Sequence, residues 1–298
     1  PLEKIKINFK NKYKESYIAT QRMVFSTSDK PCHNVSIEKI KECMFFEINN
    51  DKNFFLVGGS QISSLSYDLK KRLRNYNYSH LTSSAFVYLP NFDEISINNN
   101  KKNENFPIRN NLIKDNLLTA NKETIVVIGA RFQLRLNQSF FNNKEGGVEG
   151  GGWRSKFEHT KNSNIKWQDG FKNSVEELLT NKNISVILIY PIPEVGFDIK
   201  TKLKNFKFLS NNLLDTSFDV FKERTKSSFE LLDSIQGNNI YRVYPHTFFC
   251  NKKVKDRCVT HDGDNIFYSD DDHPSIKGAE MINDLIMKEI KKIELKLN

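Results

Sequence analysis

Two short stretches, far apart in the sequence, carry the residue types that acyl-transfer chemistry needs. Residues 54–65 read FFLVGGSQISSL, and residues 270–275 read DDDHPS. A histidine can take the proton of a serine hydroxyl when a carboxylate holds its other ring nitrogen. Asp270 precedes His273 by three residues, so both fit on one turn. Ser60, His273 and Asp270 are therefore candidates for nucleophile, base and orienting carboxylate.

Each stretch also has a simpler structural interpretation. Ser60 can cap the helix that follows it. Three aspartates ahead of a helix, with Pro274 at an early position, are ordinary charge placement at a helix start. The catalytic interpretation gains weight only when the two stretches are considered together.

A strand, a turn and a helix are predicted around Ser60. The apolar run at residues 54–57 is typical of a fully buried parallel strand, and two glycines then allow a tight turn. A serine at such a turn lies at the carboxyl edge of the sheet, where open α/β folds bind ligands. Free amides in the first helical turn can also stabilise an oxyanion. The helix is indicated by apolar residues near one face, namely Ile62, Leu65, Leu69 and Leu73.

Strands and helices are predicted to alternate along the rest of the chain. Alternation of this kind indicates an α/β fold, with a parallel sheet covered on both faces. Residues 98–105 are expected to form a surface excursion, and the glycine-rich residues 146–153 a mobile loop, either a lid or a plain connector. Further strands are predicted at 85–89, 124–129, 185–190 and 240–243, and further helices at 168–180, 215–236 and 275–297.

Composition excludes some classes of function. The chain has 298 residues and a net charge of +9, but its basic residues are spread out and form no nucleic-acid-binding motif, so no nucleic-acid partner is expected. A solvated surface facing anionic envelope polymers is the alternative explanation of the charge. There is no run of eighteen apolar residues that would span a membrane. The start at Pro1 suggests a piece of a longer precursor.

Four cysteines occur as two local pairs, Cys32 with Cys43 and Cys250 with Cys258. Neither pair has the spacing of a metal site, and the neighbouring histidines form no recognisable zinc set, so no metal or other cofactor is expected. Two disulfides are the simplest explanation, and they would require an oxidising compartment such as a periplasm. Four reduced thiols in the cytosol are the alternative.

The motifs together resemble the SGNH (GDSL-type) hydrolase superfamily, and in particular the C-terminal SGNH domain of bacterial membrane O-acyltransferases. The serine after the first strand and the Asp-x-x-His before the last helix match the first and last blocks of that superfamily. The resemblance covers residues 32–298, with residues 1–31 as a linker or approach segment. Further matching stretches are ARFQLRL, FNNKEGGVEG, YPIPEVGFD and IFYSDDDHPSIKGAE, together with the four cysteines.

This resemblance implies a fold, an activity and a location. The fold would be a flavodoxin-like three-layer sandwich with a mostly parallel five-stranded sheet. Ser60 would form an acyl-enzyme, His273 would act as base and then acid, Asp270 would orient it, and the Ser60 amide would donate to the oxyanion. The acyl donor would come from a membrane acyltransferase domain, and the acceptor would be an envelope glycan. This donor and this acceptor imply that the domain lies on the extracytoplasmic side of a bacterial inner membrane.

The chain departs from the family pattern at three places. The usual Gly-Asp-Ser-His is here Gly58-Gly59-Ser60-Gln61, which leaves the contacts of the turn open. No glycine corresponds to that of the second block. The third block, Gly-x-Asn-Asp, is replaced by Gly129-Ala130-Arg131, so Gly59, Gly129 and Arg131 are candidate oxyanion or substrate contacts. Pairing with a structural carboxylate is an equally simple role for Arg131.

The sequence therefore predicts an O-acyltransferase that acts on envelope glycans. The same three residues would also serve a carbohydrate or lipid esterase, with water as the acceptor. A third possibility is a glycan-binding domain whose catalytic site has decayed.

Overall fold

The computed structural model describes residues 32–44, 50–151, 155–204, 214–262 and 265–297. The predicted linker at residues 1–31 lies outside the described residues. Among the described residues, no helix combines the length and the apolar composition that crossing a membrane requires.

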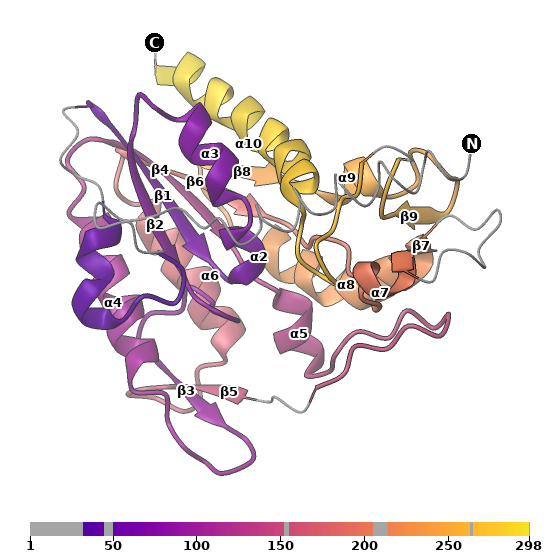
Figure 1. Ribbon diagram of the computed structural model, residues 1–298. Helices are drawn as coiled ribbons and strands as arrows, with labels where there is room; N and C mark the ends of the chain where they lie inside the picture. The colour runs from indigo at the N-terminus through magenta and orange to yellow at the C-terminus, as the bar shows by residue number, and fades with distance from the viewer. Residues whose placement is uncertain (1–31, 45–49, 152–154, 205–213, 263–264, 298) are drawn as a thin grey trace.

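A five-stranded parallel sheet forms the centre of the molecule (Figure 1). Its strand order, numbered along the sheet-forming strands alone, is 2-1-3-4-5, the order of flavodoxin-like folds. The predicted α/β class and the five-stranded sheet are thus confirmed. In spatial order the strands are β2 (Asn77–Thr82), β1 (Lys52–Gly58), β4 (Glu123–Gly129), β6 (Ile184–Ile189) and β8 (Ile240–Val243).

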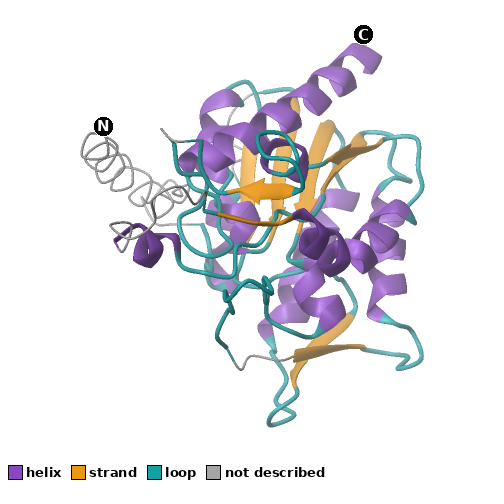
Figure 2. Cartoon of the chain, turned by 90° about the vertical axis from the view of Figure 1, so that its right-hand side faces the viewer, coloured by secondary structure: helices purple, strands orange, loops and turns teal. Residues whose placement is uncertain are grey.

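Alternate side chains of β1 enter the two halves of the hydrophobic core, because successive residues of a strand point to opposite faces. Phe54 and Leu56 pack in the half that includes residues of α3 (Ser66–Arg72) and α10 (Ile276–Leu297). Phe55 and Val57 pack in the half that includes residues of α4 (Asn105–Leu118) and α6 (Trp167–Leu178). Helix α8 (Phe218–Asp233) contributes to both halves. Figure 2 shows the sheet lying between helices.

Several small elements surround this three-layer core. Two antiparallel strand pairs lie outside the main sheet, one formed by β3 (Phe92–Ser96) and β5 (Ser155–His159), the other by β7 (Asp215–Ser217) and β9 (Arg257–Val259). The short helices are η1 (Ile37–Cys43), α2 (Ser60–Ser63), α5 (Phe132–Asn137), α7 (Ile199–Lys204) and α9 (His246–Phe249).

The strand predicted at residues 85–89 is wrong. The strand next to β1 is instead β2, whose sequence NYSHLT is too polar to be read as a buried strand. Its polar side chains are nevertheless buried, and several of them are hydrogen-bonded, as in the contact of the His80 ring with the Thr82 hydroxyl at 2.7 Å. Ala85 has a left-handed backbone (φ 52°), which interrupts an extended run, and residues 86–89 fill the core without pairing.

The helix predicted after Ser60 is divided into two short helices, α2 and α3, and the first three residues of the helix predicted at 215–236 form β7 instead. The other predicted strands and helices are found within a few residues of their expected positions, and residues 98–105 are exposed. Helix α4 was not predicted, because its asparagine-rich sequence lacks an apolar stripe. Both predicted disulfides, Cys32–Cys43 and Cys250–Cys258, are confirmed. The first closes a segment that bridges to β2 at His33 and at Met44.

Candidate active site

Ser60 is the first residue of α2, directly after the turn that ends β1. The sheet holds this turn from both sides. The Gly59 amide donates to the Gly129 carbonyl of β4 at 3.3 Å, and the Ser83 amide, which follows β2, donates to the Gly58 carbonyl at 3.1 Å. The Ser60 side chain is therefore presented at the carboxyl edge of the sheet by a turn with little freedom.

His273 lies in a compact loop between Phe267 and the start of α10. The Ser269 amide donates to the His273 carbonyl at 2.9 Å, and the Ser275 amide donates to the Phe267 carbonyl at 2.9 Å. The His273 amide donates to Asp270 Oδ1 at 2.7 Å. These bonds fix the direction in which the imidazole leaves the backbone.

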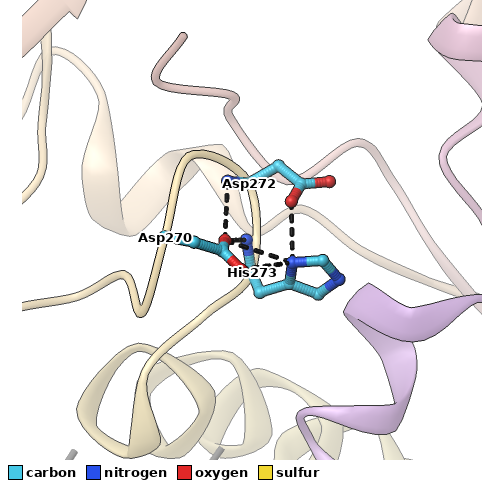
Figure 3. Close-up of side chains that lie close together, drawn as sticks. All are labelled: Asp270, Asp272 and His273. Carbon is cyan, nitrogen blue, oxygen red and sulfur yellow. Dashed lines mark hydrogen bonds and ion pairs between the residues drawn. The ribbon is translucent and has the colours of Figure 1, made fainter. Parts of the chain in front are cut away.

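The structure brings Ser60, His273 and Asp270 together. His273 Nε2 lies 2.7 Å from Ser60 Oγ, although the two residues are 213 positions apart in sequence. On the other side of the ring, His273 Nδ1 lies 2.9 Å from Asp270 Oδ2 and 3.1 Å from Asp270 Oδ1 (Figure 3). With a proton on Nδ1, the ring donates to Asp270 and presents Nε2 as an acceptor to the serine hydroxyl.

A second carboxylate also faces His273 Nδ1. Asp272 Oδ1 lies 2.7 Å from it, and Figure 3 shows Asp270 and Asp272 approaching the same ring nitrogen. Asp270, Asp272 and His273 each have a side-chain atom of a type that binds metal ions, and these atoms lie close together. Two ligands of a tetrahedral zinc ion, however, are separated by about 3.3 Å when each bond is about 2.0–2.1 Å. The shorter separations here are those of hydrogen bonds and ion pairs.

The charges of the loop shift its pKa values in opposite directions. Burial alone would lower the pKa of His273, but the Asp272 charge and the hydrogen bonds to Asp270 and Asp272 raise it well above its usual value. Burial would raise the pKa of Asp270, yet its hydrogen bond with His273 and the charge of that ring hold it at about 2. An imidazolium is thus well stabilised between these carboxylates.

Two of the three tentative contact residues are glycines with contacts inside the fold. Gly129 has no room for a side chain, because a Cβ there would lie 2.5 Å from Ile62 Cδ1. The Gly59 amide is already bonded within the sheet. The close contacts account for a glycine at position 129, whereas the Gly59 hydrogen bond uses an amide that any residue would supply; a substrate contact at either glycine stays a prediction.

Arg131 lies among carboxylates. Its Nη1 lies 2.8 Å from Glu149 Oε1 and 3.1 Å from Asp272 Oδ2, and its Nε donates to Glu194 Oε1 at 2.5 Å. Only 12% of the Arg131 side chain is exposed. The contacts agree with the simpler sequence interpretation, pairing with carboxylates, and the oxyanion contact stays a prediction.

Several side chains near the site were missed by the sequence reasoning. Gln61 and Asp272 are the chain neighbours of Ser60 and His273, and Glu149 and Glu194 lie in two of the stretches that carry the family resemblance. The need for such glutamates could be anticipated, because an arginine buried in a protein requires carboxylates that balance its charge. Which carboxylates pair with Arg131 depends on the tertiary fold.

Asp271 gives a stability prediction that is independent of catalysis. Burial, followed by the charges of Asp272, Asp270 and Glu149, raises the pKa of Asp271 to about 6. A carboxyl with a raised folded pKa destabilises the fold once pH exceeds that value, and the penalty is absent below its unfolded pKa. Asp271→Asn should therefore raise the Tm by a few degrees at pH 7.5 and leave it almost unchanged at pH 3.5. Thermal unfolding at the two pH values measures this, and an equal change at both would contradict it.

The five-stranded sheet flanked by helices is consistent with the SGNH hydrolase fold. Residues 29–288 match the profile of the family described as "SGNH domain (fused to AT3 domains)". The chain belongs to this family of SGNH domains. A comparison with curated protein sequences finds no match.

Two solved structures illustrate the similarity. The periplasmic domain of a lipopolysaccharide acetyltransferase from Salmonella ser. Paratyphi A is 16% identical, with a TM-score of 0.59, and the alignment covers 95% of this chain and 96% of that one. A family two carbohydrate esterase from Clostridium thermocellum is 14% identical, with a TM-score of 0.35 and coverage of 81% and 63%. The first comparison shows that the fold is shared over nearly the whole length of both chains.

Proposed function

We propose that this domain is a serine-dependent O-acyltransferase that acetylates a hydroxyl of a cell-envelope glycan. The observation that carries the proposal is the continuous path from Ser60 Oγ to His273 Nε2 at 2.7 Å, and from His273 Nδ1 to Asp270 Oδ2 at 2.9 Å. Along such a path the neutral imidazole can take the serine proton, which makes the serine a nucleophile.

In the first half-reaction, Ser60 Oγ attacks the carbonyl carbon of the donor ester as His273 Nε2 takes the hydroxyl proton. Asp270 holds the tautomer and stabilises the imidazolium that forms. The Ser60 amide supplies an oxyanion donor. The imidazolium then gives its proton to the leaving alcohol, and an acyl-serine remains.

In the second half-reaction, a sugar hydroxyl takes the place of the leaving alcohol. His273 Nε2 removes its proton, the sugar oxygen attacks the acyl carbon, and the proton returns to Ser60 as the ester of the glycan is released. With water as the acceptor, the same steps would give hydrolysis. The distinction between transferase and esterase therefore depends on how well the site excludes water.

The family description and the two disulfides support the rest of the proposal. Fusion to AT3 domains is a property of the family, so a membrane acyltransferase is the proposed source of the acyl group. Two disulfides suit an oxidising compartment, and we place the domain on the periplasmic side of an inner membrane.

A partition experiment tests the function. The purified domain is given an activated acetyl ester with and without a panel of glycan acceptors, and free acetate and acetylated sugar are both quantified. We expect an acceptor from an envelope glycan to divert acetyl from water to sugar, and a fluorophosphonate to label Ser60. Release of all acetyl as acetate with every acceptor would favour the esterase. Absence of both turnover and labelling would leave a glycan-binding domain.

A further inference from the structure

The two catalytic loops are joined by a second link beside the Ser60–His273 contact. Gln61, which follows Ser60, donates from Nε2 to the Asp272 carbonyl at 3.0 Å and to Asp272 Oδ2 at 3.3 Å. Asp272 in turn precedes His273. Only 3% of Gln61 and 6% of Asp272 is exposed, so this link is shielded from water.

Arg131 connects this second link to the rest of the fold. Its guanidinium contacts Asp272, Glu149 and Glu194, and Arg224 contacts the other oxygen of Glu194 at 3.0 Å. The Val195 amide also donates to the Asp271 carbonyl at 2.8 Å. Four separate segments, each carrying one of these charged side chains, are thereby tied to the loop that holds His273.

We propose that Gln61, Asp272 and Arg131 form a positioning array that sets the distance and orientation of His273 relative to Ser60. The proposal rests on the function inferred above and extends it to residues that do not touch the reacting atoms. It also gives a role to Gln61, which stands where the fused SGNH domains usually have histidine.

The contacts explain how the array acts. Asp270 lies on the same turn as His273 and can fix only the rotation of the ring relative to its own loop. The position of that loop against α2 needs a bond between the two, and the Gln61 amide supplies it. Asp272 also places its other oxygen 2.7 Å from His273 Nδ1, so the imidazolium formed during acylation is stabilised by two carboxylates.

Arg131 balances the negative charge of Asp272, the second carboxylate beside His273. Two carboxylates that share one ring nitrogen would repel each other, and a buried unpaired charge is costly. The Arg131 guanidinium balances Asp272 while its remaining donors hold Glu149 and Glu194. Burial, the charge of His273 and the charge of Arg109 lower the pKa of His33 to about 4, so His33 stays neutral and adds no second positive charge.

The first test separates positioning from binding at Gln61. Gln61→Ala should lower kcat for an activated ester, on the order of 10²-fold as expected for a small displacement of reacting groups, with KM almost unchanged. Gln61→His restores a ring N–H donor and should recover much of the loss. Gln236→Ala is the matched control and should behave as wild type, since within the described part of the chain the Gln236 side chain bonds only the Asp233 carbonyl.

The second test measures the imidazole directly. In Asp272→Asn the side chain keeps its shape and loses its charge, so the pKa of His273 should fall, as followed by the NMR titration of its ring protons. If the variant is active, the acid limb of its kcat/KM profile should move to lower pH, because the neutral imidazole is the form that accepts the serine proton. A merely structural role would lower activity and leave this titration in place.

The outcomes distinguish this proposal from the proposed function. An unchanged His273 titration in Asp272→Asn, or wild-type kcat in Gln61→Ala, would overturn the positioning array while the acyltransferase proposal stands. If wild type proves inactive, the proposed function fails, and the NMR titration still decides whether Asp272 controls the imidazole.

Discussion

Replacing Ser60 by alanine is expected to abolish the acyl-enzyme and to lower the rate of acyl transfer by about 10⁴-fold or more, as found when triad nucleophiles are removed elsewhere. Alanine has no atom that can form the ester, whereas the rest of the site stays in place. The folded state should be little affected, because the Ser60 side chain is partly exposed and bonds only to His273 among the described contacts. Initial rates with an activated ester, with intact mass measured after mixing, report both effects.

A neighbouring serine provides the matched control. Ser64 lies one turn further on, and its hydroxyl donates to the Ser60 carbonyl at 3.3 Å, away from His273. Ser64→Ala should retain rates within a few fold of wild type. An acetylated protein in Ser60→Ala, or equal losses in both variants, would show that the nucleophile lies elsewhere.

The second large effect is expected in stability, at Gly58. A Cβ built there would lie 2.0 Å from the Gly129 carbonyl oxygen and 2.9 Å from Ile62 Cγ1, and the backbone φ of +156° is one that side chains rarely adopt. The carbonyl belongs to a central strand and cannot move without breaking sheet hydrogen bonds. Gly58→Ala should therefore reduce the free energy of unfolding by about 3 kcal/mol or more, measured by denaturant unfolding.

Gly150 serves as the comparison for Gly58. No atom lies within 4 Å of a Cβ at Gly150, and its backbone needs no positive φ, so Gly150→Ala should change stability by less than about 0.5 kcal/mol. If Gly58→Ala unfolds at the wild-type denaturant concentration, the close approach of β1 and β4 at this turn is not as described.

The sheet was predictable where its strands are apolar. The runs that form β1, β4 and β6 are mostly apolar and buried on both faces, and such strands leave a clear signal. Strand β8 (IYRV) is only partly buried and was predicted from a shorter run. Strand β2 leaves no such signal, because its asparagine, histidine and threonine are buried through hydrogen bonds that only the folded chain supplies. The apolar residues 86–89 misled the prediction, since they pack in the core as a loop.

The residues of the candidate site likewise fall into two groups, those that local sequence patterns identify and those that only the fold brings together. Ser60, His273 and Asp270 were identified because each lies in a local pattern with a chemical meaning, and the structure brings them within hydrogen-bond distance. Gln61 and Asp272 stand beside them, yet their contact across 211 positions has no local signature. The partners of Arg131 depend likewise on how three loops meet at the sheet edge.

The disulfide-closed segment at residues 32–44 has a consequence for how the protein must be produced. Strand β2 lies at the border of the sheet, and this segment meets its outward side at Thr82 and again at Ser79. Unpaired backbone at such a border is a template for strands of other molecules. The Cys32–Cys43 disulfide holds the segment at residues 32–44 against this border. We therefore expect a newly made chain with reduced cysteines to expose the border and to self-associate. The yield of folded protein should then increase with the oxidising capacity of the host.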